Sequence, residues 1–136
     1  MAASFDKDPI TCHVLDTTLG RPAKGIRVRL EGGAASATAL PKTFESITDD
    51  DGRILVWLPY ISETSAGEVP VYTLLDVHGQ VTGPSRWTLR FDTAAYYGEE
   101  NTFFPEVTVT FRVNEGQTYH VPLLLNPYSY TTYRGS

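Results

Sequence analysis

The feature that most constrains this chain is an alternation of apolar and polar residues with a period of two. Residues 26–31 read IRVRLE and residues 107–113 read VTVTFRV, with an apolar side chain at every second position. Successive side chains of a β-strand point to opposite faces, so this pattern predicts strands with one face in a core. We expect further strands over six other segments: 10–16, 54–59 (a fully buried strand), 69–77, 86–91, 119–125 and 128–133.

Turn residues separate these segments. Asp51-Gly52, the Asn-Glu-Gly of residues 114–116 and Asn126-Pro127 are typical of tight turns. One short helix is expected over residues 92–98, where an aspartate can cap the first turn and a glycine can end the last. Residues 32–46 are expected to form a loop. Short strands with frequent turns and hardly any helical period predict an all-β fold, a sandwich or a barrel.

The length, composition, net charge and cysteine count narrow the class of protein. The 136 residues predict one domain over residues 1–136, and the composition, 41% hydrophobic and 20% charged, is ordinary for a globular protein. A net charge of −5 argues against nucleic acid and anionic membranes as partners. A single cysteine, Cys12, excludes an internal disulfide and fits a reducing compartment. Charged residues at 6–8 interrupt the apolar core that a secretory signal needs, so we expect an intracellular, soluble protein.

Two strands carry a mixed face that core packing does not explain. On the first, Thr11, His13 and Leu15 lie opposite the apolar Ile10, Cys12 and Val14. On the last hairpin, a two-residue turn at Asn126-Pro127 would pair Leu125 with Tyr128 and His120 with Tyr133. One face of that hairpin would then be half apolar and half polar: His120, Pro122, Leu124, Thr131 and Tyr133. Such a face predicts an interface or the wall of a binding site.

Four segments carry recognisable motifs: ITCHVLDTTLGRPAKGIRVRLEG (10–32), TDDDGRI (48–54), FDTAAYYGEENTFFPEVTVTFRV (91–113) and YHVPLLLNPYSYTTYRGS (119–136). Together they strongly resemble the 5-hydroxyisourate hydrolases of the transthyretin-related family. The resemblance implies a transthyretin-like two-sheet β-sandwich that forms a homotetramer, a dimer of dimers, with active sites in the channel between the dimers. It implies hydrolysis of 5-hydroxyisourate to 2-oxo-4-hydroxy-4-carboxy-5-ureidoimidazoline in urate degradation. It implies no metal and no organic cofactor.

The same resemblance implies the site residues. The HVLD box supplies His13, the DGR turn supplies Arg53, the YHVPLLL segment supplies His120, and the terminal motif supplies Tyr133, Arg134, Gly135 and Ser136. His13, Arg53, His120 and Tyr133 are the expected catalytic residues. The expected substrate-binding set is His13, Arg53, Tyr133, Arg134, Gly135 and Ser136. A histidine suits the general base for water, and an arginine suits ring binding and oxyanion stabilisation. Which histidine is the base stays open.

Other interpretations compete with each of these. A lone histidine on a strand is usually a surface or satisfied core residue, and Arg53 follows a common turn dipeptide. Two histidines make a poor zinc site, and the acidic run at 49–51 fits turn chemistry better than a calcium loop. Two other functions share this fold class: a non-catalytic carrier of a small aromatic ligand, and a sandwich used for adhesion or sugar binding. The cytoplasm is the expected location, with the peroxisome as the alternative.

Overall fold

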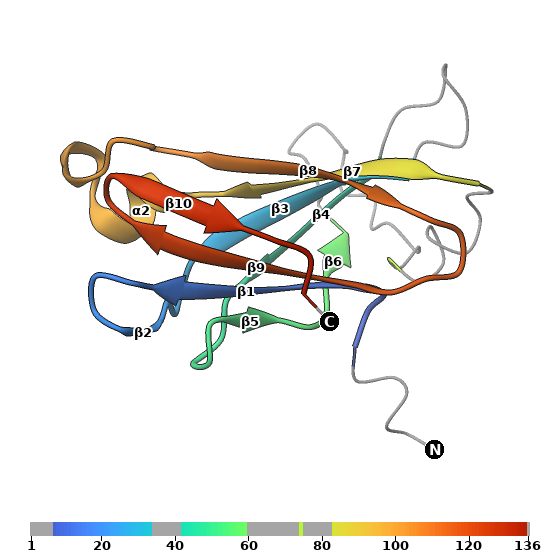
Figure 1. The fold of residues 1–136 in the computed structure, drawn as a ribbon, viewed down its shortest axis with the longest axis horizontal. Helices are drawn as coiled ribbons and strands as arrows, with labels where there is room; N and C mark the ends of the chain where they lie inside the picture. The colour runs from blue at the N-terminus through green and yellow to red at the C-terminus, as the bar shows by residue number, and fades with distance from the viewer. Residues whose placement is uncertain (1–6, 34–41, 60–73, 75–82, 136) are drawn as a thin grey trace, which may run out of the picture.

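The computed structural model describes residues 7–33, 42–59, 74 and 83–135, which form two β-sheets stacked face to face (Figure 1). Sheet A has the strand order β10-β9-β1-β2, and β5 also pairs with β1. Its strands are β1 (Ile10–Asp16), β2 (Arg21–Pro22), β5 (Arg53–Ile54), β9 (Tyr119–Asn126) and β10 (Ser129–Thr132). Sheet B has the order β6-β4-β3-β7-β8. Its strands are β3 (Arg27–Gly32), β4 (Lys42–Ile47), β6 (Leu58–Pro59), β7 (Ser85–Phe91) and β8 (Val107–Val113). The predicted all-β sandwich is confirmed.

The inner faces of the two sheets form the hydrophobic core. Ile10, Cys12 and Val14 are fully buried, as their alternation along β1 predicted. Sheet B contributes the largest buried side chains opposite them: Trp87, Phe44, Phe91, Leu30 and Leu89. Burial raises the pKa of the Cys12 thiol to about 12, so this side chain is a packed, protonated thiol and not a nucleophile.

The first and last long strands of sheet A are parallel neighbours, although they come from opposite ends of the chain (Figure 1). Their register pairs Thr11 with His120 and His13 with Pro122. The opposite edge of β1 is shared by β2 and β5, which pair with its C-terminal and central residues. Two segments that are remote from β1 in sequence, β5 and β9, therefore both pair with it.

The predicted short helix is confirmed as α2 (Thr93–Tyr97), followed by the 3-10 turn η3 (Glu99–Asn101). The side chain of Asp92 accepts a hydrogen bond from Ala95 N–H, and Gly98 follows the last helical residue. The Tyr96 hydroxyl donates to Asp16 Oδ2 at 2.8 Å, which ties the helix to the end of β1. Among the described residues, no helix is long and apolar enough to cross a membrane.

Three predicted segments need correction. The single buried strand over 54–59 is wrong, because the chain crosses there from β5 in sheet A to β6 in sheet B. Trp57 fills the crossing, and its Nε1 donates to the Ile10 carbonyl at 2.8 Å. The loop over 32–46 is wrong at Gly32, which ends β3, and from residue 42 onward, since β4 pairs with β3 and places Phe44 in the core. Residues 34–41 of this prediction lie outside the described residues. Of the strand over 69–77, only Leu74 is described, and it is helical; the rest lies outside the described residues.

A tight turn before β5 carries Arg53. Asp49 Oδ1 accepts hydrogen bonds from the backbone N–H groups of Asp51 and Arg53, both at 2.9 Å. Gly52 has a φ of +74°, and a Cβ there would lie 2.3 Å from the Val14 carbonyl oxygen. That close approach lets Val14 N–H donate to the Gly52 carbonyl at 2.7 Å. Glycine is therefore required to hold the turn directly against β1.

Replacing Gly52 with alanine should lower the free energy of unfolding by about 3 kcal/mol, because strain at positive φ and a backbone clash add together. Gly20→Ala is the matched control, since Gly20 has a φ of +68° but nothing within 4 Å of a Cβ. It should lose only about 1 kcal/mol. Urea unfolding of both variants at one protein concentration measures the difference. Equal losses would contradict the close packing of the turn on β1.

Candidate active site

β1 and β5 bring His13 and Arg53 together. The two residues are directly paired across the antiparallel β1–β5 ladder, and residues opposed in this way project from the same face of a sheet. His13 is partly buried and Arg53 is exposed. Their neighbours Cys12 and Ile54 are buried in the core, so His13 and Arg53 occupy the outer face of sheet A.

β9 adds His120 to this outer face. The parallel register sets His120 beside Thr11 and therefore diagonal to His13. The two imidazole rings have centroids 6.3 Å apart and planes inclined by 38°. Residues predicted from three separate motifs thus lie together on one surface.

The hairpin that follows differs from its predicted register by two residues. Tyr130 pairs with Leu125, where the sequence predicted Tyr128. The Asn126 side-chain oxygen accepts hydrogen bonds from Tyr128 N–H at 2.8 Å and from Ser129 N–H at 3.0 Å. Asn126 therefore stays in β9, and the turn falls on the next two residues. Because the shift is even, the predicted face keeps its members: His120, Pro122, Leu124, Thr131 and Tyr133.

The C-terminal tail closes on His120. Gly135, and not Tyr133 as predicted, lies opposite His120 in an antiparallel bridge. Gly135 N–H donates to the His120 carbonyl at 2.8 Å. A Cβ on Gly135 would lie 2.8 Å from His120 Cδ2, so a glycine is needed for the tail to pass this close to the ring. Ser136, also a predicted site residue, lies outside the described residues.

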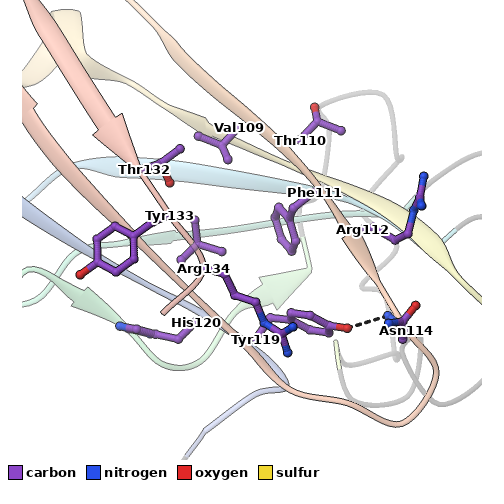
Figure 2. A pocket seen from close by; sticks show the side chains of 11 residues that line it. Val109, Thr110, Phe111, Arg112, Asn114, Tyr119, His120, Thr132, Tyr133 and Arg134 are labelled. Atoms are coloured by element: carbon purple, nitrogen blue, oxygen red, sulfur yellow. Dashed lines mark hydrogen bonds between the residues drawn. The ribbon is translucent and has the colours of Figure 1, made fainter. Parts of the chain in front are cut away.

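Tyr133 and Arg134 point in opposite directions from the tail (Figure 2). The Tyr133 ring extends to the same side as the His120 ring and is 57% exposed. Arg134 extends to the other side, where its Cζ lies 4.8 Å from the centroid of the Tyr119 ring. The structure therefore brings Tyr133 to the face with the histidines and does not bring Arg134 there.

A pocket of about 450 Å³ lies on the Arg134 side of the tail (Figure 2). It opens between β8 and the tail and has eleven lining residues: Val109, Thr110, Phe111, Arg112, Asn114, Tyr119, His120, Val121, Thr132, Tyr133 and Arg134. Neither His13 nor Arg53 lines it. We therefore assign the chemistry to the outer face of sheet A, where both histidines and Arg53 meet, and not to this pocket.

The imidazole of His120 is held at one nitrogen and kept neutral. Thr11 Oγ1 lies 2.8 Å from His120 Nδ1, and Thr11 is buried. Burial lowers the pKa of His120, and its electrostatic interactions with His13, Arg53 and Lys7 lower it further. With Nδ1 engaged, Nε2 is the ring nitrogen left for chemistry.

This arrangement suits addition of water to a carbonyl. A neutral imidazole can accept a proton from water, and a guanidinium can stabilise the oxyanion that forms. Among residues 7–33, 42–59, 74 and 83–135, no cluster of three His, Cys, Asp or Glu side chains could hold a metal ion. One contributor was not predicted as a site residue: Thr11, which holds His120 Nδ1. The signal for Thr11 was its place on the His13 face of the first strand.

The chain matches the model of the "HIUase/Transthyretin family" over residues 10–135. It is 38% identical to the mouse 5-hydroxyisourate hydrolase, with 96% of this chain and 98% of the mouse protein covered. The solved 5-hydroxyisourate hydrolase of Klebsiella pneumoniae superposes with a TM-score of 0.60 at 26% identity, covering 93% of this chain and 98% of that one. Sea bream transthyretin, solved with thyroxine, superposes with a TM-score of 0.65 at 23% identity, covering 93% and 94%. That last likeness concerns the fold alone.

The lowered pKa of His120 predicts that this ring titrates below the ordinary histidine value of about 6.5. NMR titration of the ring carbon-bound protons measures the midpoint, and the spectrum of His120→Asn identifies the signal. Lys7→Gln should move the midpoint upward, because one positive charge near the ring is removed. A midpoint at or above about 6.5 in the unmodified protein would contradict the electrostatics of the site.

Proposed function

The chain belongs to the HIUase/transthyretin family, and from that membership we propose that it is a hydrolase that opens the ring of 5-hydroxyisourate in urate degradation. The observation that carries this proposal is the meeting of His13, Arg53 and His120 on one outer face of sheet A. Relatives at 32–38% identity over nearly the whole chain are named as 5-hydroxyisourate hydrolases, which supports the same activity.

His120 is the general base in this proposal. Its Nδ1 is held by Thr11, and its lowered pKa keeps the ring neutral at pH 7, so Nε2 can accept a proton from water. Such acid–base assistance is typically worth about 10² to 10⁴ in rate. His13, whose ring centroid is 6.3 Å away, helps to orient the water and the substrate from the neighbouring strand.

Arg53 stabilises the negative charge that develops. The attacking water adds to a ring carbonyl, and the carbonyl oxygen becomes an oxyanion that the planar guanidinium can bind with two N–H groups. Collapse of this intermediate breaks the C–N bond, and the proton held by His120 passes to the departing nitrogen. The carbon is left as a carboxylic acid, which then loses its proton to water. Tyr133, exposed beside His120, borders the substrate and can donate a hydrogen bond to it.

A carrier of a small aromatic ligand shares this fold, so the superposition on transthyretin does not discriminate between the two functions. The side chains favour the hydrolase. A carrier needs neither a neutral imidazole fixed by a buried threonine nor a cation placed across from a second histidine.

We further propose a homotetramer, built as a dimer of dimers, with the outer face of sheet A lining a channel. The exposed apolar side chains at and near this face support it, since isolated domains rarely leave such groups uncovered: Leu19, Tyr128 and Tyr133 are 56%, 77% and 57% exposed.

Location in the cytoplasm, or alternatively the peroxisome, stays a prediction that imaging of a fluorescently tagged chain can test.

Substitution of Arg53 or His120 should lower kcat/KM for 5-hydroxyisourate. The assay monitors the loss of the substrate's ultraviolet absorbance. Arg53→Lys keeps a charge but loses the planar fork, and a loss of about 10²-fold is expected. His120→Gln should lose about 10² to 10⁴-fold. The matched control is Arg86→Lys, an exposed arginine on β7 of the other sheet, which should stay within about twofold. Near-normal turnover by a folded Arg53→Lys or His120→Gln protein would refute the assignment.

The tetramer should appear as a species of about 60 kDa, four copies of the 15.1-kDa chain, in size exclusion with light scattering. Leu124→Glu places a charge on the predicted interface and should shift the protein to smaller species. Thr108→Glu, at an exposed position of β8 in sheet B, is the control and should leave the mass unchanged. A monomer at all concentrations would contradict the proposed assembly.

A further inference from the structure

Successive side chains of the tail from Thr132 to Gly135 point to opposite sides, as in a β-strand, although the β9–β10 pairing ends at Thr132. The β9–β10 pairing stops at Thr132, and the next contact with β9 is the bridge between Gly135 and His120. Tyr133 extends to the same side as His120, whereas Arg134 extends to the other side (Figure 2). A Cβ on Gly135 would meet the His120 ring. The two residues between the ladder and the bridge therefore need another anchor.

Tyr119 supplies a fixed surface for that anchor. Its side chain is 8% exposed, and Arg134 Cζ lies 4.8 Å from the ring centroid, within the range of a cation–π contact. The ring is held at its far end, because the hydroxyl accepts from Asn114 N–H at 2.9 Å and donates to Gln117 Oε1 at 3.0 Å. Its own backbone N–H donates to the Pro9 carbonyl at 2.7 Å.

On its inner side the tail borders the pocket of about 450 Å³ that opens between β8 and the tail. The Arg134 side chain extends into this space (Figure 2). Within the described residues, Arg134 takes part in no ion pair with a carboxylate. Its contact with Tyr119 is therefore the interaction that fixes its direction.

We propose that Arg134 is a positioning residue: stacked on Tyr119, its guanidinium anchors the tail and so holds Tyr133 and Gly135 against His120. This replaces the substrate-binding role that the terminal motif suggested, because Arg134 points away from the face that carries His13 and Arg53. The catalytic consequence rests on the proposed hydrolase function. The anchoring itself does not, since it concerns contacts within the chain.

The consequence for His120 follows from the closeness of Gly135. Gly135 N–H donates to the His120 carbonyl, and the Gly135 Cα passes so near the ring that a methyl group would lie 2.8 Å from Cδ2. If the tail lost its contact with Tyr119, Gly135 would no longer be held beside the ring of His120, the proposed base. Small displacements of catalytic groups are costly, about 10²-fold for 1 Å, so kcat should fall more than substrate binding.

The first test measures anchoring without substrate. Amide hydrogen exchange at Gly135 should be about tenfold faster in Arg134→Gln than in the unmodified protein, because the cation–π contact is lost. Arg134→Lys keeps a cation over the ring and should retain most of the protection. Arg112→Gln is the matched control, an arginine of the same pocket without the Tyr119 contact, and should leave Gly135 unchanged. Unchanged exchange in Arg134→Gln would overturn the proposal, whether or not the protein is a hydrolase.

The second test measures turnover. Arg134→Gln should lower kcat at least about tenfold with KM within about threefold, and Arg134→Lys should restore most of it. Tyr119→Leu should give the same loss, and the double variant should be no worse than either single one, since both break one contact. Should Tyr119→Leu fail to fold, the exchange data on Arg134→Gln decide alone. A raised KM with normal kcat in Arg134→Gln, or independent losses in the double variant, would mean that Arg134 binds substrate directly.

Discussion

The parallel pairing of β1 with β9 is the constraint on which the rest of the structure depends. It joins the two ends of the chain and sets Thr11 beside His120 and His13 beside Pro122. The register is fixed from the core side, because Cys12 and Val14 on β1 and Leu123 on β9 are fully buried, and a slip of either strand by one residue would expose its own buried side chains. The same slip would turn the histidine of that strand inward. Burial of an apolar face thus determines which residues share the opposite, chemical face.

Much of this arrangement could be predicted from the sequence, and the errors have physical causes. Alternation assigned the correct faces to β1 and β9 because each has one apolar side. The hairpin turn was misplaced because Asn126 caps it with its side chain from within the strand, which no period reveals. The segment 54–59 was apolar throughout and looked like one strand, but it crosses between two sheets. A run of apolar residues indicates that a segment is buried, but it does not indicate which strands that segment pairs with.

The motifs named more residues than the outer face of sheet A holds. His13, Arg53, His120 and Tyr133 converge as expected, while Arg134 shares their motif and faces the other way. Alternation alone separates Tyr133 from Arg134, so the sequence held the signal for this difference. The fold does not separate a hydrolase from a carrier, since a solved 5-hydroxyisourate hydrolase and a transthyretin solved with thyroxine both superpose on this chain. A handful of side chains on one sheet face makes the distinction.

Turnover far beyond one equivalent tests the hydrolase account most directly. 5-Hydroxyisourate, generated in a cuvette from urate with urate oxidase, would be mixed with the protein at about one hundredth of its concentration, and its ultraviolet absorbance followed against spontaneous decay. A catalyst should clear all of the substrate well ahead of the spontaneous reaction. A carrier can affect only the small fraction it binds, so decay at the spontaneous rate would contradict the account.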